Sequence, residues 1–131
     1  MPPDPDAAQT GVSLVEAPEV CAAIRAHRYV WQNEDQLQEG LAGALTASGW
    51  TVEREVRLSE VSRIDLLIGR VGIEVKIAGT VEAVARQLQR YAASDLFDAL
   101  VLVTSRARHR AVPAVLGGKP VTVIMVGGGF A

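Results

Sequence analysis

Hydrophobic positions along the chain repeat with two different periods, and these periods separate helices from strands. Residues 15–29 have helical spacing, and a second helix is expected to follow, with Asn33 as N-cap and Gly49 suited to its end. The apolar residues of this second helix fall at helical intervals, at Leu37, Leu41, Ala44 and Leu45. The first part of the chain is therefore predicted to form two amphipathic helices.

From Trp50 the hydrophobic period changes to two, which indicates β-strands. Side chains of the segment WTVEREVRL are expected to alternate between two faces, and one face is expected to hold Val52, Arg54, Val56 and Leu58. SRIDLLIG and VGIEVKI follow as two further strands around Gly69-Arg70. This region is predicted to form three consecutive strands.

Helical spacing returns at Thr80, an expected N-cap, and continues to residue 95. FDALVLVTS is a continuous apolar run, typical of a strand covered on both faces, and KPVTVIMVG is a second such run. RARHR between them is expected in a loop or short helix. The order predicts one α/β domain over residues 14–131, with an αβββαβ core and a mixed sheet flanked by helices. Residues 1–13 are expected to be a disordered lead-in.

Composition narrows the class of protein. The apolar runs are strand-length, so no membrane segment is expected. Cys21 is the single cysteine, which excludes an internal disulfide and a cysteine-based zinc or iron–sulfur site. The first residues carry acids and prolines where a secretory signal would be basic and then apolar. A cytoplasmic protein is expected.

The charge of the chain is unevenly distributed. The net charge is −2, but residues 1–40 carry −5 and the remainder carries +3. Eleven of the thirteen basic residues are arginines, which bind phosphate in a planar, bidentate way. Phosphate contacts are compatible with this composition, although an arginine-rich composition typical of high-GC coding explains the count equally well.

Three charged residues interrupt the apolar stretch RIDLLIGRVGIEVK. A two-residue turn at Gly69-Arg70 would place Asp65 opposite Glu74, and a four-residue turn would place Asp65 opposite Lys76. In either case the three charged side chains share one face of the hairpin. The other face is expected to be core, formed by Ile64, Leu66, Ile68, Val71, Ile73, Val75 and Ile77.

Two carboxylates opposed across strands repel each other by about 0.2–1 kcal/mol. A divalent cation between Asp65 and Glu74 would reverse the sign of that interaction, and Mg²⁺ prefers one or two carboxylates plus water and phosphate. The alternative is that the charges are solvated on an exposed sheet face and neutralised by Lys76.

These residues resemble the PD-(D/E)XK nuclease superfamily. The resemblance rests on Asp65, on Glu74-Val75-Lys76 and on the αβββαβ order, and it covers roughly Glu34 to Val126. Ile64 stands where the name-giving proline would be. The chain is also similar to small nuclease-like proteins of phages and actinobacteria. The resemblance implies a restriction-endonuclease-like fold.

Two helices supply further matches to the superfamily. Glu34 lies three residues before Leu37 and seven before Leu41, so it shares their face; alternatively it only favours the helix dipole. QLQRY supplies Gln87 and Tyr91, the Q-x3-Y of the RecB-type branch, although such residues are also ordinary on a helix surface.

The resemblance implies roles for these residues. Mg²⁺ or Mn²⁺ would be bound by the carboxylates of Asp65 and Glu74 and by the backbone carbonyl of Val75, and Glu34 would bind a second metal or a metal-bound water. Lys76 would orient the attacking water or stabilise the transition state. Gln87 and Tyr91 would position the substrate backbone or Lys76.

Several arginines are candidates for nucleic-acid binding. Arg86 and Arg90 form a like-charge pair one turn apart, which an anion such as phosphate would relieve. RARHR is the densest basic cluster and contains Arg106, Arg108 and Arg110; it is equally compatible with a solvated loop. His27 and His109 are too isolated to indicate a metal site.

The predicted function is that of a metal-dependent nuclease acting on nucleic acid, with DNA as the expected substrate. An endonuclease for branched DNA, such as a Holliday-junction resolvase, would be a homodimer, because two symmetric cuts need two sites. The alternative is a catalytically inactive module with a nuclease fold that binds DNA or a protein partner.

Overall fold

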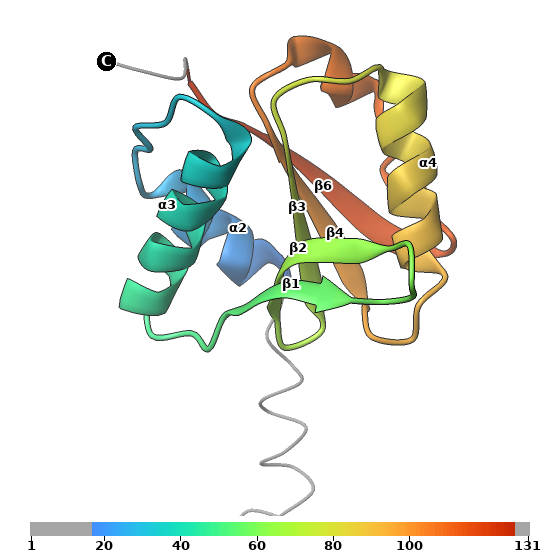
Figure 1. Cartoon of the computed structure of the whole chain (residues 1–131), viewed down its shortest axis with the longest axis horizontal. Helices are drawn as coiled ribbons and strands as arrows, with labels where there is room; N and C mark the ends of the chain where they lie inside the picture. The colour runs from blue at the N-terminus through green and yellow to red at the C-terminus, as the bar shows by residue number, and fades with distance from the viewer. Residues whose placement is uncertain (1–16, 128–131) are drawn as a thin grey trace, which may run out of the picture.

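The computed structural model describes residues 17–127, so the expected lead-in over residues 1–13 lies outside the described residues. This part of the chain is an α/β fold with three α-helices and a six-stranded mixed sheet (Figure 1). The helices are α2 Ala17–Arg25, α3 Glu34–Ala47 and α4 Val81–Ala92, and a short 3₁₀ helix, η1, spans Ala107–Ala111. The strands are β1 Glu53–Arg57, β2 Arg63–Ile68, β3 Val71–Lys76, β4 Ala99–Thr104, β5 Val115–Leu116 and β6 Lys119–Met125.

The strands are ordered β1-β2-β3-β4-β6-β5 across the sheet. The first three pair antiparallel, β3 with β4 and β4 with β6 pair parallel, and β5 pairs antiparallel with β6. Every residue of β4 is buried, which confirms the expected strand covered on both faces. The second apolar run was expected to be equally covered, but β6 is only partly buried because the two-residue β5 is all that lies beyond it.

Helices cover both faces of the sheet. Helices α2 and α3 lie on one face and α4 lies on the other (Figure 1). Each face has its own hydrophobic cluster: the α2/α3 cluster includes Leu37, Leu41, Leu66, Ile73 and Val101, and the α4 cluster includes Leu88, Tyr91, Phe97, Leu100 and Leu102. Within residues 17–127 no helix has the length and apolar character needed to cross a membrane.

Side-chain caps define where the helices begin. The side chain of Asn33 accepts a hydrogen bond from the backbone N–H of Gln36 at 2.8 Å, and Thr80 does the same for Ala83 at 3.1 Å, as expected for N-caps. Gly49, with φ of 99°, follows the end of α3.

The first helix is shorter than the expected residues 15–29, because it ends at Arg25. The hydroxyl of Tyr29 donates to the carbonyl of Ile24 at 2.8 Å, so the chain has turned back on the helix end by this point. Trp31 is then buried in the α2/α3 cluster. Tertiary packing of these two aromatic residues therefore ends the helix before its hydrophobic spacing does.

Strand β1 changes face at Glu55, which corrects the expected alternation. Glu55 has φ of 52°, a left-handed backbone that is unusual for a residue other than glycine. Val52 packs against the α2/α3 cluster, whereas Val56 and Leu58 pack against the α4 cluster. Ile64, which pairs with Val56, follows it into the α4 cluster and does not share a core face with Leu66 as predicted.

Gly72 makes this crossing possible. A Cβ atom at Gly72 would lie 2.6 Å from Cδ1 of Ile64 and 2.9 Å from the ring of Phe97. Both side chains are fully buried, so Ile64 occupies the space that a side chain at position 72 would need. The side chains of β2 therefore change from one face of the sheet to the other between Leu66 and Ile64, at Asp65.

Candidate active site

The hairpin between β2 and β3 has the two-residue turn that the sequence predicted as one of two options. Ile68 pairs with Val71 around Gly69-Arg70, and Gly69 has φ of 57°. The ladder continues to Leu66 and Ile73, and this register places Asp65 opposite Glu74. The two acids therefore lie where regular pairing of the two strands stops.

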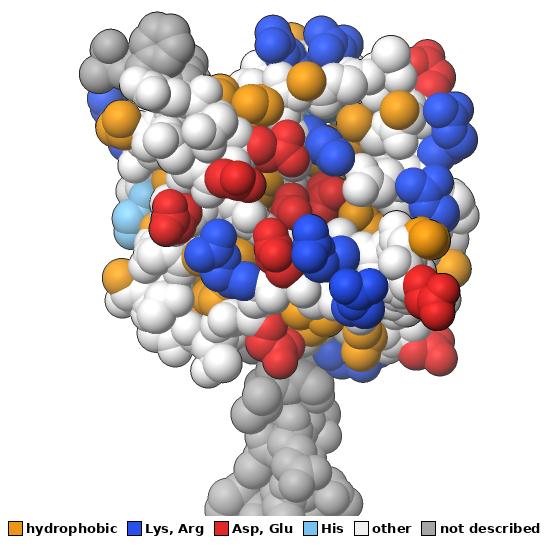
Figure 2. All heavy atoms as spheres, viewed as in Figure 1, with side chains coloured by type: hydrophobic (Ala, Val, Ile, Leu, Met, Phe, Trp, Pro, Cys, Tyr) orange, Lys and Arg blue, Asp and Glu red, His pale blue; other side chains and the backbone are white. Residues whose placement is uncertain are grey.

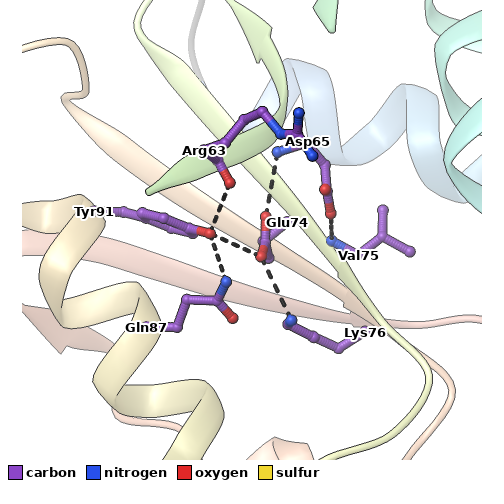
Figure 3. A network of polar contacts seen from close by, with 7 residues as sticks. All are labelled: Arg63, Asp65, Glu74, Val75, Lys76, Gln87 and Tyr91. Carbon is purple, nitrogen blue, oxygen red and sulfur yellow. Dashed lines mark hydrogen bonds and ion pairs between the residues drawn. The ribbon is translucent and has the colours of Figure 1, made fainter. Parts of the chain in front are cut away.

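Beyond this point, side chains replace the backbone hydrogen bonds of the hairpin. The backbone N–H of Asp65 donates to Oε1 of Glu74 at 3.2 Å, and the backbone N–H of Val75 donates to Oδ2 of Asp65 at 2.8 Å (Figure 3). Each carboxylate thus binds the backbone of the opposite strand. The two strands are held apart by the acids, and the site opens between them.

Helix α4 contacts the site through the residues of the Q-x3-Y pattern. The hydroxyl of Tyr91 lies 3.0 Å from Oε2 of Glu74 and 3.0 Å from the carbonyl oxygen of Arg63, and Nε2 of Gln87 donates to this hydroxyl at 2.6 Å (Figure 3). Tyr91 is buried, not on the helix surface. Its role in this structure is to hold Glu74 and the start of β2, and Gln87 orients it.

Helix α3 contacts the site from the other face of the sheet. Glu34 interacts electrostatically with Lys76 and Asp65, and its carboxylate faces the backbone N–H of Ile77. One turn later, Nε2 of the buried Gln38 donates to the carbonyl oxygen of Asp65 at 3.1 Å. The helix therefore brings a third carboxylate to the site and also fixes the backbone of the first.

The acids of the site repel one another. Burial, followed by repulsion from Asp65, raises the pKa of Glu74 from 4.5 to about 8, and this side chain is only 3% exposed. Burial also raises the pKa values of Asp65 and Glu34. Lys76 is the nearby cation, with Nζ 3.7 Å from Oε2 of Glu74. Once Glu74 has lost its proton, three carboxylates with one lysine leave an excess of negative charge.

A divalent cation can be accommodated by this donor set. Within residues 17–127 no three acidic, histidine or cysteine side chains are gathered closely enough to form a complete metal site. Mg²⁺ needs only one or two carboxylates when water and phosphate supply its other ligands. The backbone N–H of Val75 binds Asp65 of β2, and the carbonyl of the next residue, Lys76, faces β4. Because successive residues of a strand direct their backbone groups to opposite sides, the carbonyl of Val75 points toward β2. The carbonyl of Val75 is therefore available beside both acids.

The site lies on a face of mixed charge. Figure 2 shows acidic side chains near the centre of this face, with Lys and Arg side chains around them. Arg86 and Arg90 are exposed on α4, next to Gln87 and Tyr91, and Arg106 and Arg108 are exposed in the segment that includes η1. Arg110 is also exposed, and within residues 17–127 none of these five arginines has an acidic side chain within 4.0 Å.

Sequence reasoning missed two residues near the site. Gln38 follows the same spacing rule as Glu34, three residues before Leu41 and seven before Leu45, so it could have been found by the same argument. His109 is fully buried and hydrogen-bonded through both ring nitrogens, although it looked isolated in the sequence. No local pattern could reveal this, because its partners Thr104 and Gly79 lie on different segments.

A search among protein-family models, curated proteins and solved structures finds no match to this chain.

Proposed function

We propose that this chain is a Mg²⁺- or Mn²⁺-dependent nuclease of the PD-(D/E)XK superfamily that hydrolyses phosphodiester bonds of DNA. The observation that supports this most directly is the opened hairpin, where Asp65 and Glu74 bind each other's strands and Lys76 lies beside Glu74. Solvated, merely neutralised charges would not be buried to this extent. The arrangement instead suits a cation and a phosphate.

The fold is compatible with this proposal. The order α3, β1, β2, β3, α4, β4 is the αβββαβ core that the resemblance implies, and the two acids lie on its second and third strands. Gln87 and Tyr91 contact Glu74 from the following helix. We therefore assign the chain a restriction-endonuclease-like fold as part of the proposal.

Charge balance explains why a cation would bind. When all three acids are ionised, as binding of a cation requires, Glu34, Asp65 and Glu74 carry two more negative charges than Lys76 balances, and the buried position of Glu74 makes this excess costly. Asp65, Glu74 and the carbonyl of Val75 would hold the metal, and Glu34 would bind a second metal or a water molecule of the first. When bound, a divalent cation offsets charge on the scissile phosphate and makes its water more acidic.

The residues of the chain have separate tasks in hydrolysis. The carboxylates of Asp65 and Glu74 would be metal ligands with a fixed orientation, because each one accepts a hydrogen bond from a backbone N–H. The side chain of Lys76 is 24% exposed, so its ammonium group can contact both the acids and a phosphate bound from solvent. In hydrolysis it would donate a hydrogen bond to the attacking water or to a phosphate oxygen. Tyr91 keeps its proton because burial raises its pKa, and it donates to Glu74.

A cleavage assay tests the proposal. Purified protein is incubated with plasmid, linear, single-stranded and four-way-junction DNA and with RNA, in Mg²⁺, Mn²⁺ or EDTA. We expect cutting that requires the metal and that falls at least 100-fold in Asp65→Asn and in Lys76→Ala. The preferred substrate then identifies the type of nuclease.

Glu39→Gln is the matched control, because Glu39 is an exposed acid on the same helix as Glu34 and lies away from that residue's face. It should cleave like the wild type. Absence of cutting of every substrate at protein in excess over nucleic acid would reject catalysis. In that case metal-independent binding of DNA or of a protein would identify the chain as a non-catalytic module.

A further inference from the structure

His109 forms a buried polar link between two loops. It is 0% exposed, with Nδ1 2.6 Å from Oγ1 of Thr104 and Nε2 2.8 Å from the carbonyl oxygen of Gly79. Thr104 ends β4, and Gly79 lies between β3 and α4. The imidazole therefore connects η1 to the loop that follows the strand carrying Lys76.

The hydrogen bonds of this link define which ring nitrogen carries the proton. A carbonyl oxygen can only accept, so Nε2 is the donor to Gly79. In the neutral ring Nδ1 then accepts from the hydroxyl of Thr104, whose oxygen in turn accepts from the backbone N–H of Arg106 at 3.0 Å. Every polar group in this buried chain has a partner, which makes the connection rigid.

Two arginines of the same segment are fixed to the same loop. Nε of Arg106 donates to the carbonyl of Ile77 at 2.7 Å, and Nε of Arg108 donates to the carbonyl of Gly79 at 2.9 Å. Both side chains remain exposed. With Nε used by the backbone, the two Nη groups of each guanidinium are left to bind an external acceptor.

The position of this loop relates the two arginines to the proposed catalytic site. Ile77 follows Lys76 directly, and the backbone N–H of Ser105 donates to the carbonyl of Lys76 at 3.4 Å. Thr80 then caps α4, which carries Gln87 and Tyr91. A nucleic-acid strand held at Lys76 would pass next to Arg106 and Arg108.

We propose that His109 is a positioning residue that fixes Arg106 and Arg108 to bind two backbone phosphates of the strand held at Lys76. The inference rests on the proposed function, since it takes nucleic acid as the ligand. An exposed arginine loses side-chain entropy when it binds phosphate. Fixing both guanidiniums in advance removes part of that cost, which accounts for a buried histidine that is hydrogen-bonded to the same loop as both arginines.

The test measures binding of fluorescent DNA in EDTA as a function of NaCl concentration. In His109→Phe, which keeps an aromatic ring but neither hydrogen bond, we expect affinity to fall roughly 10-fold. The slope of log affinity against log salt should become shallower by about one to two, as for the loss of one or two phosphate contacts. His109→Gln, which can still donate to Gly79, should recover part of the affinity, and it replaces His109→Phe if that variant does not fold.

Double substitutions separate positioning from a general structural effect. In an Arg106→Ala/Arg108→Ala background His109→Phe should cause no further loss, whereas in an Arg86→Ala/Arg90→Ala background its full effect should persist. The rise in melting temperature caused by Mn²⁺ should be the same as in the wild type, because the carboxylates are untouched. Unchanged affinity and salt slope in folded His109→Phe, or losses that add fully to those of Arg106→Ala/Arg108→Ala, would overturn the inference.

The binding data in EDTA, compared with the cleavage assay in Mg²⁺ or Mn²⁺, distinguish failure of this inference from failure of the proposed function. Wild-type protein that binds DNA in EDTA but cuts none of the substrates in Mg²⁺ or Mn²⁺ would reject catalysis, while the binding data still decide the role of His109. Wild-type protein that neither binds nucleic acid in EDTA nor cuts it in Mg²⁺ or Mn²⁺ would reject both.

Discussion

The hydroxyl of Tyr91 lies 3.0 Å from Oε2 of Glu74, and both side chains are buried. This contact joins helix α4 to the centre of the candidate site. It also places a neutral donor against an acid whose pKa is raised by burial and by Asp65. The hydrogen bond lowers that pKa, so Tyr91 favours the ionised form of Glu74 that can bind a cation.

Tyr91→Phe should weaken the site without removing any charge. The change leaves Glu74 without its donor and Gln87 without its acceptor, so we expect a loss of about 1–3 kcal/mol in the free energy of unfolding. The pH at which cation binding is half-maximal should move upward, because Glu74 ionises less readily. Denaturant unfolding and a pH series of Mn²⁺ titrations measure the two effects; an unchanged pH dependence would show that the hydroxyl does not act on Glu74.

Stability of the metal-free protein should decrease as the pH rises from about 4.5 to about 8. Over this interval the folded state keeps the proton on Glu74 that the unfolded chain has already released, so deprotonation favours unfolding by up to about 1.4 kcal/mol per pH unit. Above about pH 8 the dependence should level off. Urea unfolding in EDTA across this range measures it.

Glu74→Gln should remove most of this pH dependence, whereas Glu39→Gln, an exposed acid of α3, should retain it. Added Mn²⁺ should stabilise the wild type more at pH 8 than at pH 6, because the cation competes with the proton at the lower pH. Equal slopes in wild type and Glu74→Gln would show that this carboxyl group titrates normally.

Gln38→Leu tests the contribution of α3. The substitution leaves the carbonyl of Asp65 without its side-chain donor, and we expect a loss of about 1–3 kcal/mol in the free energy of unfolding together with lower activity. Gln32→Ala, at an exposed position before α3, should be close to neutral in both assays. Thermal unfolding and cleavage rates compare the two. Full activity in Gln38→Leu would mean that the backbone of Asp65 is adequately held by Glu74.

Two glycine-to-alanine substitutions should change the stability of the protein in opposite directions. Gly72→Ala would place a methyl group 2.6 Å from Ile64 and 2.9 Å from Phe97, and such overpacking costs about 1–3 kcal/mol. Gly43→Ala lies inside α3 with nothing within 4 Å of the new methyl group, so it should stabilise by about 0.5–1 kcal/mol. Ile64→Val should partly rescue Gly72→Ala by shortening the side chain that it meets. Neutral behaviour of Gly72→Ala would indicate that β2 can move away from this position.

Local patterns were sufficient to predict the helix caps and the order of the helices and the five longer strands, but they missed the two-residue β5. Asn33 and Thr80 cap their helices because the capping oxygen lies only three residues before the N–H that it accepts from. The two-residue turn at Gly69-Arg70 was one of two options in the sequence, and the observed register selects it. Patterns failed at Glu55, where a left-handed backbone moves Val56 and Ile64 to the other face.

The sequence by itself determined that Asp65 lies near Glu74 and Lys76, because strand alternation and a short turn restrict neighbouring residues to one face. It also indicated Glu34 as a further acid of the site, through its spacing from Leu37. Only the tertiary structure decided that Tyr91 and Gln38 hold the two acids, and that His109 joins η1 to the loop after Lys76. These contacts join segments 17 to 30 residues apart, and their geometry depends on how the helices pack against the sheet, which hydrophobic period does not specify.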